Sequence, residues 1–87
     1  MMSSERFPIR VRLFAGARAA VGTDTLTLEV PCGGTVRVVR EELARRFPGL
    51  RGLVASAGFA VGDVFVRDEM ELAPDTELAW IPPVSGG

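Results

Sequence analysis

The chain has 87 residues, a formal net charge of −1 at pH 7 and 47% hydrophobic residues, which predicts one small domain with an apolar core. It contains no histidine and one cysteine, so the usual zinc and iron–sulfur ligand sets and the Ser-His-Asp or Cys-His catalytic groups cannot be assembled from it. Charges of both signs are interspersed, and the hydrophobic runs are short. We therefore expect no cofactor or metal bound by this chain, no nucleic-acid or membrane partner, no catalysis by the chain alone, and a cytoplasmic location.

The N-terminal part predicts two strands joined by a long connection. Residues 7–14 alternate between apolar and polar, which places Ile9, Val11 and Leu13 on a buried face. Residues 15–22 are rich in alanine and predict a short helical turn, and residues 25–30 alternate again. These two strands are expected to pair as a β-hairpin.

A helix is predicted after the Pro-Cys-Gly-Gly turn at residues 31–34. Thr35 stands at the expected N-cap position, and Pro48 with Gly49 ends the helix. Its apolar stripe consists of Val36, Val39, Leu43 and Phe47.

The rest of the chain predicts further strands. In order these are an irregular region at 50–58, a strand at 59–67, a short strand at 70–72, a turn at 73–76 and a final strand at 77–81. Gly62 is expected to form a bulge or bend, and Pro74 the first central position of the turn. The order predicts an α+β fold of the β-grasp (ubiquitin-like) kind, a mixed four- to five-stranded sheet with one main helix packed on one face.

Three apolar residues fall on strand faces that should be polar. Phe14 and Phe65 fall on the same strand faces as charged residues. Trp80 is expected in the core because of its bulk, so its strand neighbour Ile81 is expected to face outward. Either Phe14, Phe65 and Ile81 form one apolar patch beside the C-terminus, or each is an isolated exposed hydrophobe.

We expect a single domain over residues 1–81 and an extended, flexible tail over residues 82–87. Pro82 and Pro83 lack amide donors and favour a semi-rigid arm. Gly86 and Gly87 have no Cβ, so the terminal acyl group can pass through a narrow channel. A carboxylate resists acyl transfer until it is activated, for instance as an acyl-adenylate made by an ATP-using partner. The opposing interpretation is a small chain end without function.

Two stretches resemble the small, sulfur-carrying subunit of molybdopterin synthase, the MoaD type within the ubiquitin-like superfamily. They are Leu-Phe-Ala-Gly-Ala-Arg-Ala-Ala-Val-Gly at 13–22 and Ala-Trp-Ile-Pro-Pro-Val-Ser-Gly-Gly at 79–87. The resemblance runs from about residue 9 to residue 87 and implies a sulfur carrier of molybdenum cofactor biosynthesis. It implies that an E1-like enzyme adenylates Gly87 with ATP and that a sulfur donor of persulfide or rhodanese type converts it to a thiocarboxylate. The large synthase subunit would then pass the sulfur to cyclic pyranopterin monophosphate.

The resemblance also implies which residues meet the partners. Gly86 and Gly87 would enter the active site of the large subunit, within a heterotetramer that has two small subunits at the ends of a large-subunit dimer. Arg18 matches an arginine of the family, with a structural or docking role left open. The implied contact residues for the large subunit are Phe14, Phe65, Ile81, Pro82, Pro83, Val84 and Ser85.

The sequence departs from the family pattern in two places. Gly62 stands where the family often has asparagine, and residues 74–76 replace its usual Asp-Gly-Asp turn. Both departures concern loop geometry rather than the tail.

Three other functions compete with this one. The chain could serve another sulfur pathway (thiamine, cysteine or tRNA thiolation), act as a ubiquitin-like modifier whose Gly87 forms an isopeptide bond, or be a binding module with an inert tail. The sequence contains no lysine, so an activated Gly87 has no lysine on its own chain to acylate.

Overall fold

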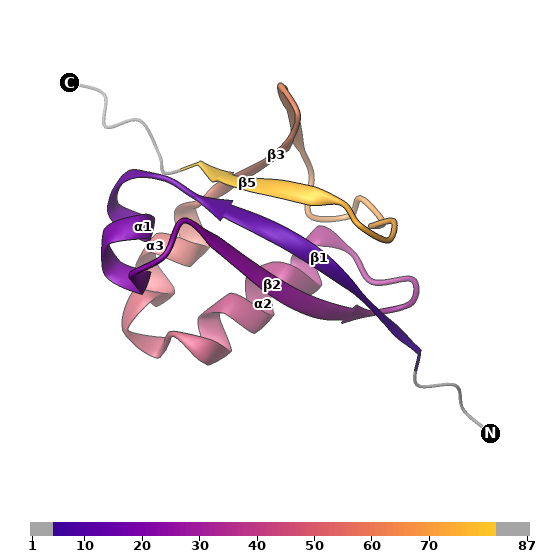
Figure 1. Ribbon diagram of the computed structural model, residues 1–87, viewed down its shortest axis with the longest axis horizontal. Helices are drawn as coiled ribbons and strands as arrows, with labels where there is room; N and C mark the ends of the chain where they lie inside the picture. The colour runs from indigo at the N-terminus through magenta and orange to yellow at the C-terminus, as the bar shows by residue number, and fades with distance from the viewer. Residues whose placement is uncertain (1–4, 82–87) are drawn as a thin grey trace.

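The computed structural model describes residues 5–81, which form one mixed five-stranded sheet with helices packed on it (Figure 1). The strands are β1 (Arg6–Leu13), β2 (Thr25–Pro31), β3 (Gly58–Val61), β4 (Val64–Val66) and β5 (Glu77–Ile81). Their order across the sheet is β2-β1-β5-β3-β4. Strands β1 and β5 run parallel, and the other neighbours are antiparallel. The sheet is therefore of the predicted α+β, β-grasp type, with the last strand at its centre.

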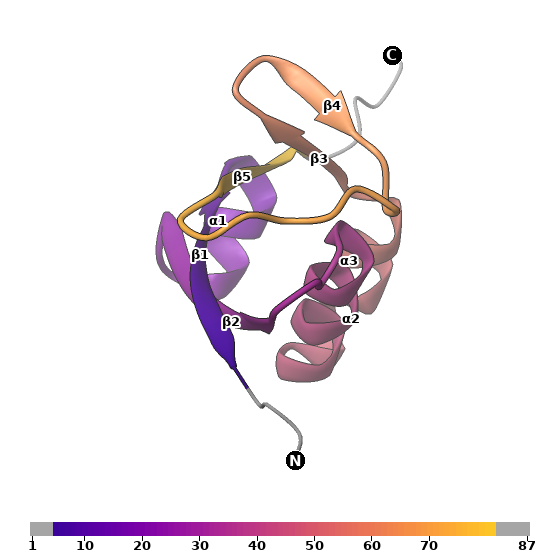
Figure 2. The ribbon, with the colours of Figure 1, turned by 90° about the vertical axis from the view of Figure 1, so that its right-hand side faces the viewer.

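The helices are α1 (Ala15–Val21), α2 (Val36–Arg46) and α3 (Arg51–Ser56), with a 3₁₀ turn η1 (Pro48–Leu50) between the last two. Figure 2 shows α2 and α3 together on one side of the sheet. The predicted main helix is confirmed, but the irregular region predicted at 50–58 is wrong. It holds the last residue of η1 and all of α3, and both elements are too short for a helical period to show in the sequence. None of the helices formed by residues 5–81 has the length and apolar character needed to cross a bilayer.

Helix α2 begins after Thr35, as predicted, but the Thr35 side chain makes no capping hydrogen bond. Backbone carbonyls of the 68–70 loop take that role. The Val36 N–H donates to the Met70 carbonyl and the Arg37 N–H to the Asp68 carbonyl, each at 3.0 Å. These two contacts satisfy first-turn donors that a helix leaves unpaired.

The single strand predicted at 59–67 is instead a hairpin of β3 and β4, in which Val61 pairs with Val64. Gly62 has φ +60° at the first central position of the two-residue turn, the place where a II′ hairpin turn needs glycine. Of the bulge or bend predicted at Gly62, the bulge is wrong and the bend takes the form of this tight turn. The short strand predicted at 70–72 is also wrong, because that segment contributes an isolated bridge between Thr35 and Glu71.

The turn predicted at residues 73–76 is confirmed. The Thr76 N–H donates to the Ala73 carbonyl at 3.2 Å, with Pro74 at the first central position. Asp75 follows with φ +64°, the left-handed conformation that a type II turn requires there.

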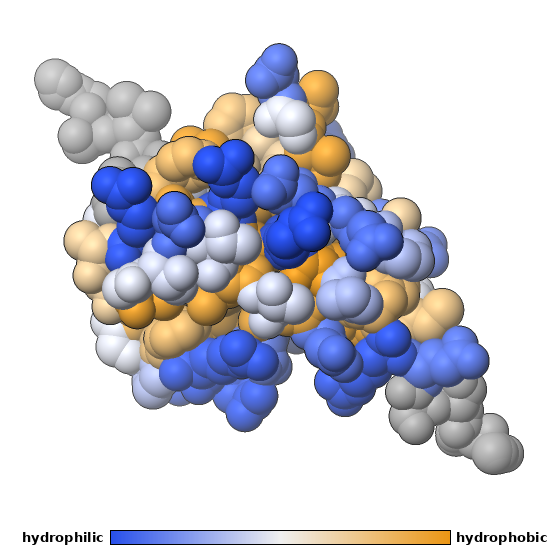
Figure 3. All heavy atoms as spheres, in the orientation of Figure 1, coloured by the Kyte–Doolittle hydropathy of each residue, from blue (hydrophilic) through white to orange (hydrophobic). Residues whose placement is uncertain are grey.

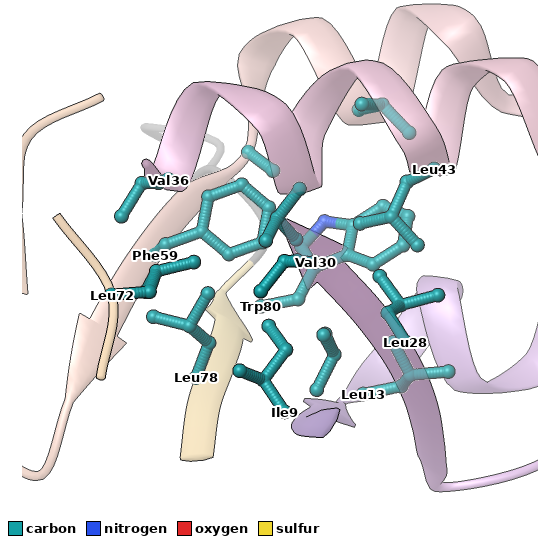
Figure 4. Packing of buried hydrophobic residues seen from close by; sticks show 14 of the residues in the cluster. Ile9, Leu13, Leu28, Val30, Val36, Leu43, Phe59, Leu72, Leu78 and Trp80 are labelled. Atoms are coloured by element: carbon teal, nitrogen blue, oxygen red, sulfur yellow. The ribbon is translucent and has the colours of Figure 1, made fainter. Parts of the chain in front are cut away.

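The core fills the space between the sheet and the helices (Figure 4). Trp80, 1% exposed, lies in it as predicted, and its ring centroid is 6.4 Å from that of Phe59 at an interplanar angle of 44°. The buried cluster comprises Ile9, Val11, Leu13, Ala17, Leu28, Val30, Val36, Val39, Leu43, Val54, Ala57, Phe59, Leu72, Leu78 and Trp80. Phe47, predicted on the buried stripe of α2, is partly buried against this cluster.

Candidate functional site

The sheet face opposite the helices carries a small apolar surface over β5, β3 and β4. Trp80 and Phe59 pair with each other and point into the core, so their strand neighbours point to the other face. One row on that face runs straight across four strands, and a second row pairs Gly58 with Ile81. The first row is Arg12, Ala79, Ala60 and Phe65.

We call Phe14, Gly58, Ala60, Phe65, Ala79 and Ile81 the outer-face patch. Phe65 is 67% exposed and Phe14 39% exposed, which confirms that these two aromatic residues face outward. Ile81 is half-buried. Ala60 is 5% exposed although it lies outside the core cluster, so neighbouring side chains on the outer face cover it.

The Phe65 ring leans over β3 toward the end of β5. A Cβ atom placed on Gly58 would lie 2.9 Å from Phe65 Cε1, 3.3 Å from Phe65 Cδ1 and 3.9 Å from the Ile81 carbonyl oxygen. The ring therefore rests on the glycine that pairs with Ile81. An exposed aromatic group thus stands beside the last described residue of the chain.

Arg12 gives the patch a charged border. Its guanidinium carbon lies 5.5 Å from the centroid of the Phe14 ring, within cation–π range. Figure 3 views the molecule with β1, β2 and β5 in front; hydrophilic side chains dominate this side, and hydrophobic atoms are exposed at the projecting β3–β4 hairpin. At this hairpin Val64 is 65% exposed and Phe65 67% exposed.

Behind the patch, Arg40 ties α2 to the segment that enters β3. Its guanidinium donates to the carbonyls of Val54 at 2.7 Å and Ala57 at 2.9 Å, and its carbon lies 5.0 Å from the Phe59 ring centroid. It also forms two hydrogen bonds to the Asp68 carboxylate. These bonds hold the pKa of Asp68 below its usual range, against a smaller opposing effect of burial.

Sequence reasoning missed Arg40, Gly58 and Ala60. The alternation of residues 58–61 could have placed Ala60 on the outer face, because it follows the core residue Phe59 in the same strand. The sequence held no comparable signal for Arg40, which reads as one of several surface arginines of α2.

Two predicted features are not brought into the patch by any described contact. Arg18 is exposed on α1, and no contact of its side chain decides between the two roles left open. The predicted tail residues Pro82, Pro83, Val84, Ser85, Gly86 and Gly87 lie outside the described residues.

Comparison with known proteins places the chain among small β-grasp carriers. The ThiS family matches residues 11–87. The molybdopterin synthase sulfur carrier subunit of Arabidopsis thaliana is 38% identical over 79 residues, covering 91% of this chain and 82% of that protein.

Two solved structures have the same fold. A putative molybdopterin converting factor, subunit 1, from Pyrococcus furiosus has a TM-score of 0.79 and 27% identity, covering 90% of this chain and 99% of the other. Small archaeal modifier protein 1 from Methanosarcina acetivorans has a TM-score of 0.78 and 27% identity, covering 95% and 99%. The chain therefore belongs to the ThiS family, within its MoaD-type group of molybdopterin synthase sulfur carrier subunits.

Proposed function

We propose that this chain is a sulfur carrier of molybdenum cofactor synthesis and that its terminal Gly87 bears the sulfur. The observation that carries the proposal is the similarity to a molybdopterin synthase sulfur carrier subunit over 91% of the chain. The composition supports it, because a chain without histidine and with one cysteine has few groups for catalysis of its own. The chemistry then belongs to partners, and this chain supplies the transferred group.

The cycle begins with activation of the Gly87 carboxylate. An E1-like enzyme joins this carboxylate to the α-phosphate of ATP, releasing pyrophosphate and leaving an acyl-adenylate. A persulfide on the sulfur donor attacks the acyl carbon and displaces AMP, and reduction by a thiol then frees the thiocarboxylate. Adenylation is needed because a carboxylate is a poor acyl donor, whereas AMP is a good leaving group.

The thiocarboxylate then acts inside the large synthase subunit. Its sulfur attacks cyclic pyranopterin monophosphate, and hydrolysis of the resulting acyl–sulfur bond returns Gly87 as a carboxylate. Two such transfers supply the two sulfurs of the dithiolene. The large subunit holds both reactants in place, which converts a bimolecular encounter into a step within one complex.

Docking of the large subunit is assigned to the outer-face patch. Phe14 and Phe65 are exposed, Ile81 is at the end of the central strand, and β5 leads directly into residue 82. An exposed apolar patch with a charged border matches the general composition of a protein interface. In this arrangement, contact with the patch and insertion of residues 82–87 take place together.

Intact-mass measurement tests the proposal. The protein is incubated with an E1-like adenylating enzyme, ATP and a persulfide donor, and the same reaction is run on a chain lacking Gly86 and Gly87. We expect one oxygen-to-sulfur exchange located at Gly87 in the full chain and none in the truncated chain. The truncated chain is also tested for cofactor synthesis together with the large subunit. Normal cofactor synthesis with the truncated chain would exclude the proposal.

A second candidate function is protein modification, favoured by the structural likeness to small archaeal modifier protein 1. The same experiment separates the two functions when other proteins are present. A modifier yields Gly87 joined to lysines of those proteins, whereas a carrier yields the thiocarboxylate. Because the sequence contains no lysine, side-chain conjugates between copies of this chain are expected in neither case.

A further inference from the structure

Position 58 needs a glycine because the Phe65 ring lies against it, and not because of its backbone conformation. Its φ is not positive, so the backbone conformation is open to other residues. A Cβ on Gly58 would nevertheless lie only 2.9 Å from Phe65 Cε1, whereas a Cβ on Gly16, Gly49 or Gly52 would meet nothing within 4 Å. The space that a methyl group would fill at position 58 is occupied by the Phe65 ring.

This contact limits the freedom of an exposed aromatic side chain. Phe65 is 67% exposed and belongs to β4, the edge strand of the sheet. Its direct cross-strand partner is Ala60, and Gly58 lies one step further along the same face. A ring seated across two small residues loses rotational freedom before it meets a partner, so less is lost on binding.

We infer that Gly58 is a positioning residue for partner docking, whose missing side chain seats the Phe65 ring beside Ile81. The inference rests on the proposed docking role of the outer-face patch. The partner surface it fits is an apolar pocket that receives one aromatic ring held in a fixed orientation. Gly58 itself acts through Phe65.

The Gly58→Ala variant tests this inference, with Gly52→Ala as the matched control on α3. The clash at position 58 involves the far end of an exposed side chain, so the ring can swing into solvent and the fold is retained. We expect unchanged or slightly higher resistance to urea. We also expect Kd for the large subunit, measured by calorimetry, to rise about ten-fold, equivalent to about 1.4 kcal/mol.

Two further measurements separate positioning from a general structural effect. In a Phe65→Ala background, Gly58→Ala should cause no additional loss of binding, because the seat has no ring to hold. In the free protein, NMR should show the Gly58 α-proton resonances displaced by the ring current of Phe65, and this displacement should vanish in Phe65→Ala.

The inference is overturned if Gly58→Ala binds like the wild type, if its loss persists without Phe65, or if the ring-current shift is absent. If the wild-type chain fails to bind the large subunit at all, the proposed docking role is overturned, and the NMR shift still decides whether Gly58 seats the ring. The two failures are therefore distinguishable.

Discussion

Arg40 and Asp68 are 28 residues apart in the sequence, yet two guanidinium nitrogens of Arg40 meet both carboxylate oxygens of Asp68, at 3.2 and 2.8 Å. Paired geometry of this kind is the stronger form of a charged hydrogen bond. The remaining Arg40 donor bonds the carbonyls of Val54 and Ala57. One side chain thus joins α2, the end of α3 and the loop before β5.

Replacing Arg40 by alanine should lower the free energy of unfolding by about 2–4 kcal/mol, because charged hydrogen bonds are lost and part-buried acceptors are left unpaired. Urea unfolding followed by Trp80 fluorescence measures the change. Arg45→Ala is the control. Arg45 pairs with Glu42 on the exposed face of α2, and its loss should cost far less stability than the loss of Arg40, because exposed ion pairs contribute little. Equal losses in the two variants would contradict the assigned role of Arg40.

The Asp68 carboxylate predicts a pH dependence of stability. Hydrogen bonds from Arg40 lower its pKa in the folded state, so its contribution is present above the unfolded pKa and is lost as pH falls through the folded pKa. The stability difference between wild type and Asp68→Asn should therefore be largest at neutral pH and shrink below about pH 4. Urea titrations at a series of pH values test this. Glu69→Gln, at an exposed neighbouring carboxylate, should change the curve little. A constant difference between wild type and Asp68→Asn across the series would refute the linkage.

Phe65→Asp should weaken binding to the large synthase subunit by at least ten-fold without unfolding the chain, since exposed aromatic residues dominate many interfaces and add little to the fold. Phe14→Asp and Ile81→Asp are expected to act in the same direction, with some loss of stability at the half-buried Ile81. Calorimetric titration gives the Kd, and far-UV circular dichroism checks the fold. Leu53→Asp is the control, because Leu53 is an exposed hydrophobe on α3 (37%, against 39% for Phe14) that lies outside the patch. Wild-type binding by all three patch variants would remove the docking assignment.

Replacing Trp80 should mainly lower the stability of the fold, whereas replacing its neighbour Ile81 should mainly weaken binding to the partner. Trp80 is 1% exposed and packs near Phe59, so Trp80→Ala should cost about 3–5 kcal/mol of stability. Trp80→Phe, which retains a ring, should cost less. Thermal unfolding followed by far-UV circular dichroism ranks the variants, since the fluorophore is lost. A mild effect of Trp80→Ala would mean that the core does not depend on this ring.

Asp75 occupies a backbone conformation that glycine adopts more readily, with φ +64°. Asp75→Gly should relieve that strain, partly offset by the greater entropy of the unfolded chain, for a net change between zero and about 1 kcal/mol of stabilisation. Asp75→Ala should destabilise, because alanine lacks the local side-chain hydrogen bonds that help aspartate to adopt this conformation. Urea midpoints compare the three proteins. Greater stability of Asp75→Ala than of Asp75→Gly would run against this account.

The predictions that succeeded depend on local periodicity. Alternation in the strands placed Trp80 in the core and exposed Phe14 and Phe65, and the apolar stripe located α2. Each of these patterns repeats over several residues, so burial on one face leaves a trace in the sequence. The role of the outer-face patch in docking stays a prediction.

The failures concern short elements and long-range contacts. Helix α3 has six residues and contains Gly52, and the carbonyls near its end are bonded by Arg40 from a different helix. A glycine such as Gly62 within a strand pattern is compatible with a bulge and with a turn. The pairing of Val61 with Val64 shows that it forms a turn. The seat of Phe65 on Gly58 follows from strand register, which one sequence does not display.

The central position of β5 also determines how the protein responds to force. A pull on residue 82 by a partner that has captured the tail acts along β5, which is bonded to β1 on one side and to β3 on the other. Both ladders then resist in shear, with many hydrogen bonds sharing the tension, rather than opening one bond at a time. Resistance to such pulling depends on the unfolding rate. The strand order therefore favours retention of the fold when a force is applied along β5.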